Sequence, residues 1–172
     1  MGLSLLAPLD PWALAAHLDI PVITLSSMAE SAPHAVHYFS SVSTGEFSAV
    51  TVFDGTKRMI VHNDSHARGR QANDIAHEVS HGLLLHPPKP ALAANGCRNL
   101  NDAMEKETDW LASVLLIPEE AALNIVKRNL SLDEAAAFYG VSQQLVRWRL
   151  GATGAKTRVS RTREFYKRSR IH

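Results

Sequence analysis

The feature that most constrains this chain is the segment His77-Glu78-Val79-Ser80-His81, in which two histidines stand four residues apart and a glutamate follows the first. On a helix, side chains four residues apart lie on one face, so both imidazoles can reach the same metal ion. Glu78 leaves the helix beside them and is placed to exchange a proton with a water molecule at the metal. The pattern therefore predicts a metal site of the type that zinc peptidases use.

The residues around this motif have helical periodicity. Ile75, Val79 and Leu83 recur at intervals of four, and two prolines at positions 87 and 88 end the pattern, because proline lacks an amide hydrogen and clashes with the preceding turn. We therefore expect one helix that begins near residue 70 and carries both histidines. The competing interpretation is a pair of ordinary core histidines, each satisfied by a buried polar partner.

A second amphipathic helix is expected over residues 101–117, and it offers a third metal ligand. Glu107 stands three residues after Met104 and four before Leu111, within the apolar stripe of this helix. A carboxylate is almost never buried without a partner, and a bound dication is a natural one. The alternative is that Glu107 is an exposed carboxylate on the outside of the helix.

Glu105 is the rival to Glu107 as the third ligand. Asp102 and Glu105 have the spacing of a capping box, in which both side chains bind amide groups at a helix start, so Glu105 already has a simpler role. A catalytic zinc site also keeps one position open for water. The ligand set that the sequence predicts is therefore His77, His81 and Glu107.

Glu78 is the predicted general base, which takes a proton from water and later passes it to the leaving amine. Zinc is the expected ion, although a site of two histidines and a carboxylate also accepts manganese or iron. Asp74, which precedes His77 by three residues, and Asp109 on the second helix are candidates to orient an imidazole through a hydrogen bond. A solvated helix carboxylate is an equally good interpretation of Asp74.

A peptidase of this type also needs a group that stabilises the oxyanion of the tetrahedral intermediate. His66, before the metal helix, and Tyr139, after the second helix, are the candidates that we select. For each of them, a structural or exposed role is the competing interpretation.

These motifs together resemble the ImmA/IrrE family of metallo-endopeptidases. The family pattern joins an Arg-Gln segment to H-E-x-x-H and continues to a helix of the form E-A-[DN]-x-F-A-x-x-L-L-M-P. Here that helix reads Glu107-Thr-Asp-Trp-Leu-Ala-Ser-Val-Leu-Leu-Ile-Pro118. Further likeness at residues 10–22, 58–63 and 141–150 extends the resemblance over most of the chain.

The resemblance implies a zincin-like fold and cleavage of a helix-turn-helix transcriptional repressor, which would release genes of mobile elements, prophages or stress responses. Three departures from the family pattern stand out. Asn73-Asp74 replaces a Phe-Thr type of pair, Thr108 replaces an alanine, and Leu111 replaces a phenylalanine. None of them removes a predicted metal ligand or Glu78.

The fold class expected from the sequence is α+β, a minimal zincin-like metallopeptidase core followed by a helical region. A strand over residues 21–25 and a hairpin around Asp54-Gly55 form a small sheet before the metal helix, and residues 26–45 receive no assigned structure. An extended peptide substrate could add to the edge of such a sheet as a further strand. We place the core at residues 1–128 and a helix-turn-helix-like region with a basic C-terminal tail at residues 129–172.

The helical region supports an alternative function. Ser131 and Glu134 form a capping box, Gly140 suits a tight turn, and Ser142 can cap a second helix that carries Arg147 and Arg149. Residues 145–172 hold nine lysines or arginines and one glutamate, a net charge of +8 in a chain whose total is +1. The alternative is a DNA-binding regulator that contacts DNA through Arg147 and Arg149 and uses the metal core as a scaffold or sensor.

The remaining composition suits a soluble protein of the cytoplasm. The 172 residues are 45% hydrophobic, enough for one compact domain with a small appendage, and the single cysteine, Cys97, allows no intrachain disulfide. The first residues lack the basic and apolar segments of a signal peptide, and no run reaches the length of a membrane-spanning helix. We therefore expect a protein substrate, possible contact with DNA, and no membrane.

Overall fold

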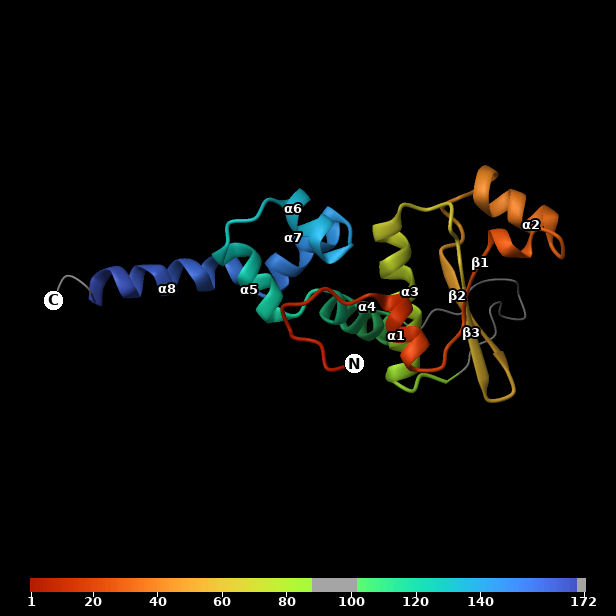
Figure 1. Cartoon of the computed structure of the whole chain (residues 1–172), viewed down its shortest axis with the longest axis horizontal. Helices are drawn as coiled ribbons and strands as arrows, with labels where there is room; N and C mark the ends of the chain where they lie inside the picture. The colour runs from red at the N-terminus through yellow and green to blue at the C-terminus, as the bar shows by residue number, and fades with distance from the viewer. Residues whose placement is uncertain (88–101, 170–172) are drawn as a thin grey trace.

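The structure, a computed structural model, describes residues 1–87 and 102–169 and has the α+β architecture that the sequence predicts (Figure 1). Cys97 lies outside the described residues. The elements in chain order are α1 (Pro11–His17), β1 (Val22–Thr24), η1 (Ser26–Met28), α2 (Pro33–His37), η2 (Tyr38–Val42), β2 (Ala49–Asp54), β3 (Lys57–His62), α3 (Arg68–Leu83), α4 (Asp102–Leu116), α5 (Glu119–Lys127), α6 (Leu132–Tyr139), α7 (Gln143–Ala152) and α8 (Ala155–Ser169).

The sheet has three strands in the order β1-β3-β2. Strand β1 runs parallel to β3, with Val22 opposite Ile60, and β2 runs antiparallel to β3, with Ala49 opposite His62. Gly55 takes a φ of 59° in the turn between β2 and β3, a left-handed conformation that costs glycine little. The predicted strand and hairpin are thereby confirmed.

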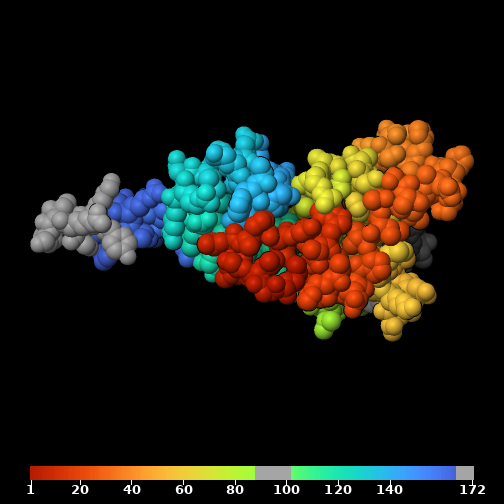
Figure 2. All heavy atoms as spheres, viewed as in Figure 1, coloured from red at the N-terminus to blue at the C-terminus, as the bar shows by residue number. Residues whose placement is uncertain are grey.

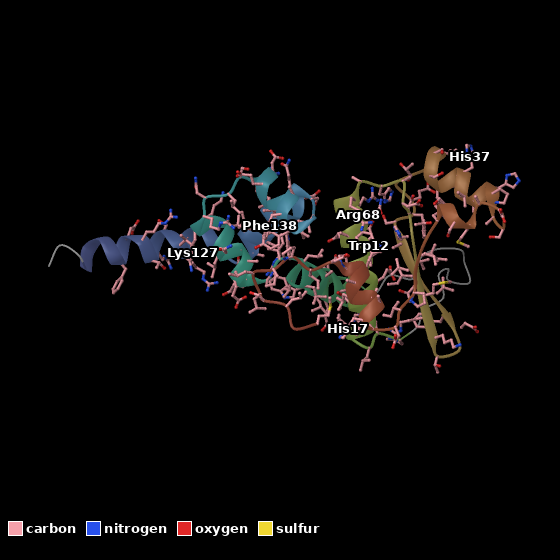
Figure 3. All side chains as sticks on the ribbon, viewed as in Figure 1. Trp12, His17, His37, Arg68, Lys127 and Phe138 are labelled. Carbon is pink, nitrogen blue, oxygen red and sulfur yellow. The ribbon has the colours of Figure 1, made fainter. Side chains whose placement is uncertain are left out.

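Helix α1 fixes the N-terminal part of the chain to the start of α3. The Asp10 carboxylate accepts a hydrogen bond from the Trp12 amide at 3.0 Å and caps the helix, as its position before Pro11 predicts. The Arg68 guanidinium carbon lies 3.3 Å from the centre of the Trp12 ring, a cation–π contact between the two elements (Figure 3).

Helix α3 is packed on two sides. Ile75 and Val79 face the sheet, where they share a core cluster with Ile60. Ala76 belongs to a second cluster, which includes Ala112 of α4 and continues into the helical region. Because α3 is held on both sides, the direction of each side chain on it is well determined.

Helices α5 to α8 lie at the other end of the molecule from the sheet (Figure 1). The capping box of Ser131 and Glu134, the left-handed Gly140 and the Ser142 cap all form as the sequence predicts. The basic tail is helical through most of its length: α8 packs on α5, and its C-terminal end extends beyond the other elements (Figure 1). None of the helices in the described part of the chain is long and apolar enough to span a membrane.

Two N-terminal segments are organised in ways that the sequence did not indicate. Residues 26–45, which lack a consistent hydrophobic period, form the short helical elements η1, α2 and η2. The residues before α1, dark red in Figure 2, lie beside the teal to light-blue helices that follow α4. There the hydroxyl of Tyr139 lies 3.4 Å from the carbonyl oxygen of Leu6 and donates a hydrogen bond to it.

The first turn of α3 also touches the turn between α6 and α7. A Cβ atom added to Gly69 would lie 2.7 Å from the carbonyl carbon of Val141 and 2.9 Å from the amide nitrogen of Ser142. Both are backbone atoms, which cannot move aside without shifting a helix. Gly69 therefore allows the turn between α6 and α7 to dock directly on α3.

We expect Gly69→Ala to lower the free energy of unfolding by about 1–3 kcal/mol, the usual cost of overpacking. Gly82→Ala is the matched control on the same helix, because its added Cβ would meet only the end of the Arg58 side chain, which can rotate away. That variant should be neutral or gain up to about 1 kcal/mol from helix propensity. Urea unfolding of both variants gives the comparison, and equal midpoints would contradict the close contact at Gly69.

Candidate metal centre

Three side chains from α3 and α4 converge on one point. The Nε2 atoms of His77 and His81 lie 3.1 Å apart, as their spacing on α3 requires. The Oε2 atom of Glu105, on α4, lies 3.3 Å from Nε2 of His77 and 3.5 Å from Nε2 of His81. Two nitrogens and one carboxylate oxygen thus form a nearly equilateral triangle.

This triangle has the dimensions of a zinc site. Zinc binds imidazole nitrogen and carboxylate oxygen at about 2.0–2.2 Å in tetrahedral geometry, which places any two donor atoms about 3.3–3.5 Å apart. The three observed separations lie within a few tenths of an ångström of that range. The three side chains are between 21% and 26% exposed, so water and a substrate can reach the centre. The donor set fits a catalytic zinc ion.

The carboxylate that lies beside both histidines is that of Glu105 and not that of Glu107, which we predicted as the third ligand. Side chains two residues apart on a helix point about 200° apart, so only one of the two glutamates can face α3. Glu107 is 60% exposed, with its Oε2 atom 3.5 Å from Nε2 of His86. The apolar stripe drawn from Met104 and Leu111 was misplaced.

Most of the residues that α4 buries are small, so the sequence gives little apolar signal for its inner face. They include Thr108 and Ala112, three and seven residues after Glu105, together with Ser113 and Leu116. A helix face that is counted from these residues includes Glu105 and excludes Glu107. The capping-box spacing of Asp102 and Glu105 pointed away from this role. The informative signal was the pair Glu105 and Asp109, two carboxylates four residues apart.

Asp109 contacts the first histidine, as we predicted for it. Its Oδ1 atom lies 2.9 Å from Nδ1 of His77 and can accept the proton on that nitrogen. This hydrogen bond fixes the tautomer and leaves the lone pair of Nε2 free for a metal ion. Asp109 and Glu105 thus act on His77 from one face of α4.

Asp74 has different neighbours from those we predicted. Its Oδ2 atom lies 3.7 Å from Nδ1 of His66 and 3.8 Å from Nε of Arg70. Burial raises the pKa of the Asp74 carboxyl, and the nearby cationic group of Arg70 opposes that rise. The side chain therefore pairs with the residues that precede the motif.

Glu78 projects toward the sheet. The hydroxyl of Thr51, on β2, donates to its Oε2 atom at 2.5 Å. Burial raises the pKa of Glu78, while the hydrogen bond from Thr51 and the charge of His77 act in the opposite direction. A carboxyl with a raised pKa is suited to accept a proton and return it near neutral pH.

The two candidates for oxyanion stabilisation lie elsewhere or are already engaged. Tyr139 is 3% exposed in the core of the helical region, so it cannot reach a substrate, and that assignment was wrong. Nε2 of His66 lies 2.6 Å from the carbonyl oxygen of Thr44. Donation to that carbonyl uses the N–H group that an oxyanion would require.

Arg149 is buried, which corrects its predicted contact with DNA. It is 2% exposed, and its Nε donates at 2.8 Å to the carbonyl oxygen of Ile117, at the end of α4. Val146 is buried three residues earlier, so a helical count along α7 places Arg149 on the same inward face. Of the two arginines that the DNA-binding alternative requires, only Arg147 is exposed.

The chain matches the IrrE N-terminal-like domain of the M78 peptidases over residues 15–151. That span contains both helices of the centre and strand β2, and it ends before α8. Searches of the curated proteins and of the solved structures found no match.

The assignment of the third ligand predicts a difference between two neighbouring variants. Glu105→Gln should weaken zinc binding by more than about 100-fold, the upper end of what loss of an outer partner costs. Glu107→Gln makes the same chemical change two residues away and should leave zinc binding within a few-fold of the wild type. Competition with a chromophoric chelator measures both, and the reverse order would restore Glu107 as the ligand.

Proposed function

The chain belongs to the IrrE N-terminal-like family of peptidases, and on that premise we propose that it is a zinc-dependent endopeptidase that cleaves a helix-turn-helix transcriptional repressor or antitoxin. The observation that carries the catalytic part is the position of Glu78, which directly follows one donor of a zinc-sized triangle and is held by Thr51. A scaffold would require the three donors but would have no use for a partly buried carboxylate beside them.

Each residue of the centre has one role in this reaction. His77, His81 and Glu105 would hold the zinc ion, and the chemistry that it would supply when bound is that of a Lewis acid. Glu78 accepts a proton from water as the water oxygen attacks the peptide carbonyl carbon. It then delivers that proton to the amine nitrogen as the C–N bond breaks. Thr51 keeps the Glu78 carboxylate in place through its hydrogen bond.

The substrate peptide is proposed to bind along β2. This strand is at one edge of the described sheet, with β3 on its inner side. Thr51 lies in the middle of β2 and touches Glu78, so a peptide that added to this edge would pass beside the base. An extended linker in the substrate could be held there mainly by backbone hydrogen bonds.

The identity of the substrate rests on the resemblance to the ImmA/IrrE family. A repressor of the helix-turn-helix class has folded domains that protect most of its chain, and a linker between them can adopt the extended conformation that the β2 edge requires. Cleavage of that linker would separate DNA binding from the rest of the repressor and release genes of mobile elements, prophages or stress responses. Such a substrate would place the reaction in the cytoplasm.

The proposal is tested by incubating the protein and zinc with the helix-turn-helix repressor encoded nearest to it, and by measuring the mass of the repressor. Glu78→Gln is the control, because it should retain zinc and lose cleavage by at least about 100-fold, the low end of what general-base catalysis supplies. A single cut that the wild type makes and Glu78→Gln does not make is the expected result. Equal cleavage by both proteins would contradict the role of Glu78, and an intact repressor would contradict the substrate.

A further inference from the structure

His86 lies beside the metal centre, and none of the roles described above includes it. It follows the end of α3, and its side chain is only 10% exposed. Its Nδ1 atom lies 2.9 Å from Nδ1 of His81, and its Nε2 atom lies 3.5 Å from Oε2 of Glu107. His86 therefore stands between a histidine of the centre and the glutamate that turns away from it.

The proposed role of His81 as a metal ligand decides which nitrogen of His81 and of His86 carries a proton. Because Nε2 of His81 faces His77 and Glu105, a metal ion there would use its lone pair, and the proton must be on Nδ1. Two Nδ1 atoms at 2.9 Å can share only one proton. His81 is then the donor and Nδ1 of His86 is the acceptor, which puts the proton of His86 on Nε2, toward Glu107.

Thr108 offers a second acceptor at a greater distance. Its hydroxyl donates to the carbonyl oxygen of Met104 at 2.8 Å, so the lone pairs of its oxygen remain available. That oxygen lies 3.3 Å from Nδ1 of His81 and 3.3 Å from Nδ1 of His86, and the residue is fully buried. The threonine that departs from the family pattern thus lies within reach of both histidines.

We propose that His86 is the positioning residue for His81: it accepts the Nδ1 proton of His81 and is itself oriented by Glu107. The arrangement parallels the one on the other side of the centre, where Asp109 accepts the Nδ1 proton of His77. This inference rests on the proposed zinc site. It also gives Glu107 a role in the outer part of that site rather than as a ligand.

The size of the effect follows from the distances. Loss of a partner that orients a metal-binding histidine typically weakens metal binding about 10- to 100-fold. His86→Leu removes the acceptor at 2.9 Å but leaves Thr108, so we expect the lower end of that range, about 10-fold. Glu107→Gln should have a smaller effect, because 3.5 Å is at the outer limit of a hydrogen bond.

The experiment measures zinc affinity of the full chain by competition with a chelator, together with thermal unfolding of the metal-free protein. His86→Asn is the rescue variant, since its amide oxygen can occupy the place of Nδ1 and accept from His81. Thr108→Val alone should change zinc affinity little. Combined with His86→Leu, it should weaken binding by more than the product of the two single effects, because both of these acceptors are then removed.

The expected result is a zinc affinity that falls in His86→Leu, recovers in His86→Asn, and falls furthest in the double variant. Wild-type affinity in His86→Leu would overturn the inference, and so would a His86→Asn variant as weak as His86→Leu. A change in the unfolding temperature of the metal-free protein with no change in zinc affinity would show a purely structural role. A wild-type chain that binds no zinc would instead overturn the proposed function itself.

Discussion

The metal centre depends on the close packing of α3 against α4. Ala76 on α3 and Ala112 on α4 are buried in one core cluster, and Thr108, one turn before Ala112, is also fully buried. The distance between two packed helices is set by the size of the side chains at their contact, and these are small. Only this approach brings the carboxylate of Glu105 within 3.5 Å of both histidines. A larger residue in this contact would separate the donors.

Helix α3 supplies both a metal ligand and the general base, because adjacent residues on a helix point about 100° apart. His77 faces α4, where Glu105 and Asp109 meet it, and Glu78 faces the sheet, where Thr51 meets it. The ligand His77 and the base Glu78 therefore lie on different sides of α3, and each side is packed in its own core cluster. The same logic extends along α4, where Glu105 and Asp109 face the centre while Glu107 turns toward His86.

Sequence reasoning succeeded where the signal was local. The H-E-x-x-H helix, the hairpin around Gly55 and the capping box at Ser131 depend on neighbouring residues, and each formed where it was predicted. Prediction failed where the position of a residue depends on which face of its helix is turned toward the rest of the protein. Glu107 was placed on the inner face because most of the residues that α4 buries are small or polar and give a weak apolar period. Arg149 was placed outside because of its charge, although the buried Val146 and Leu150 put it on the inner face of α7.

The central claim is that His77, His81 and Glu105 hold a zinc ion beside Glu78. A crystal structure of the full chain grown with zinc, with the ion located by its anomalous scattering, tests this most directly. We expect one ion bonded to Nε2 of both histidines and to the Glu105 carboxylate, with Nδ1 of His86 within hydrogen-bond distance of His81. An ion bonded to Glu107, or an ion away from the two histidines, would contradict it.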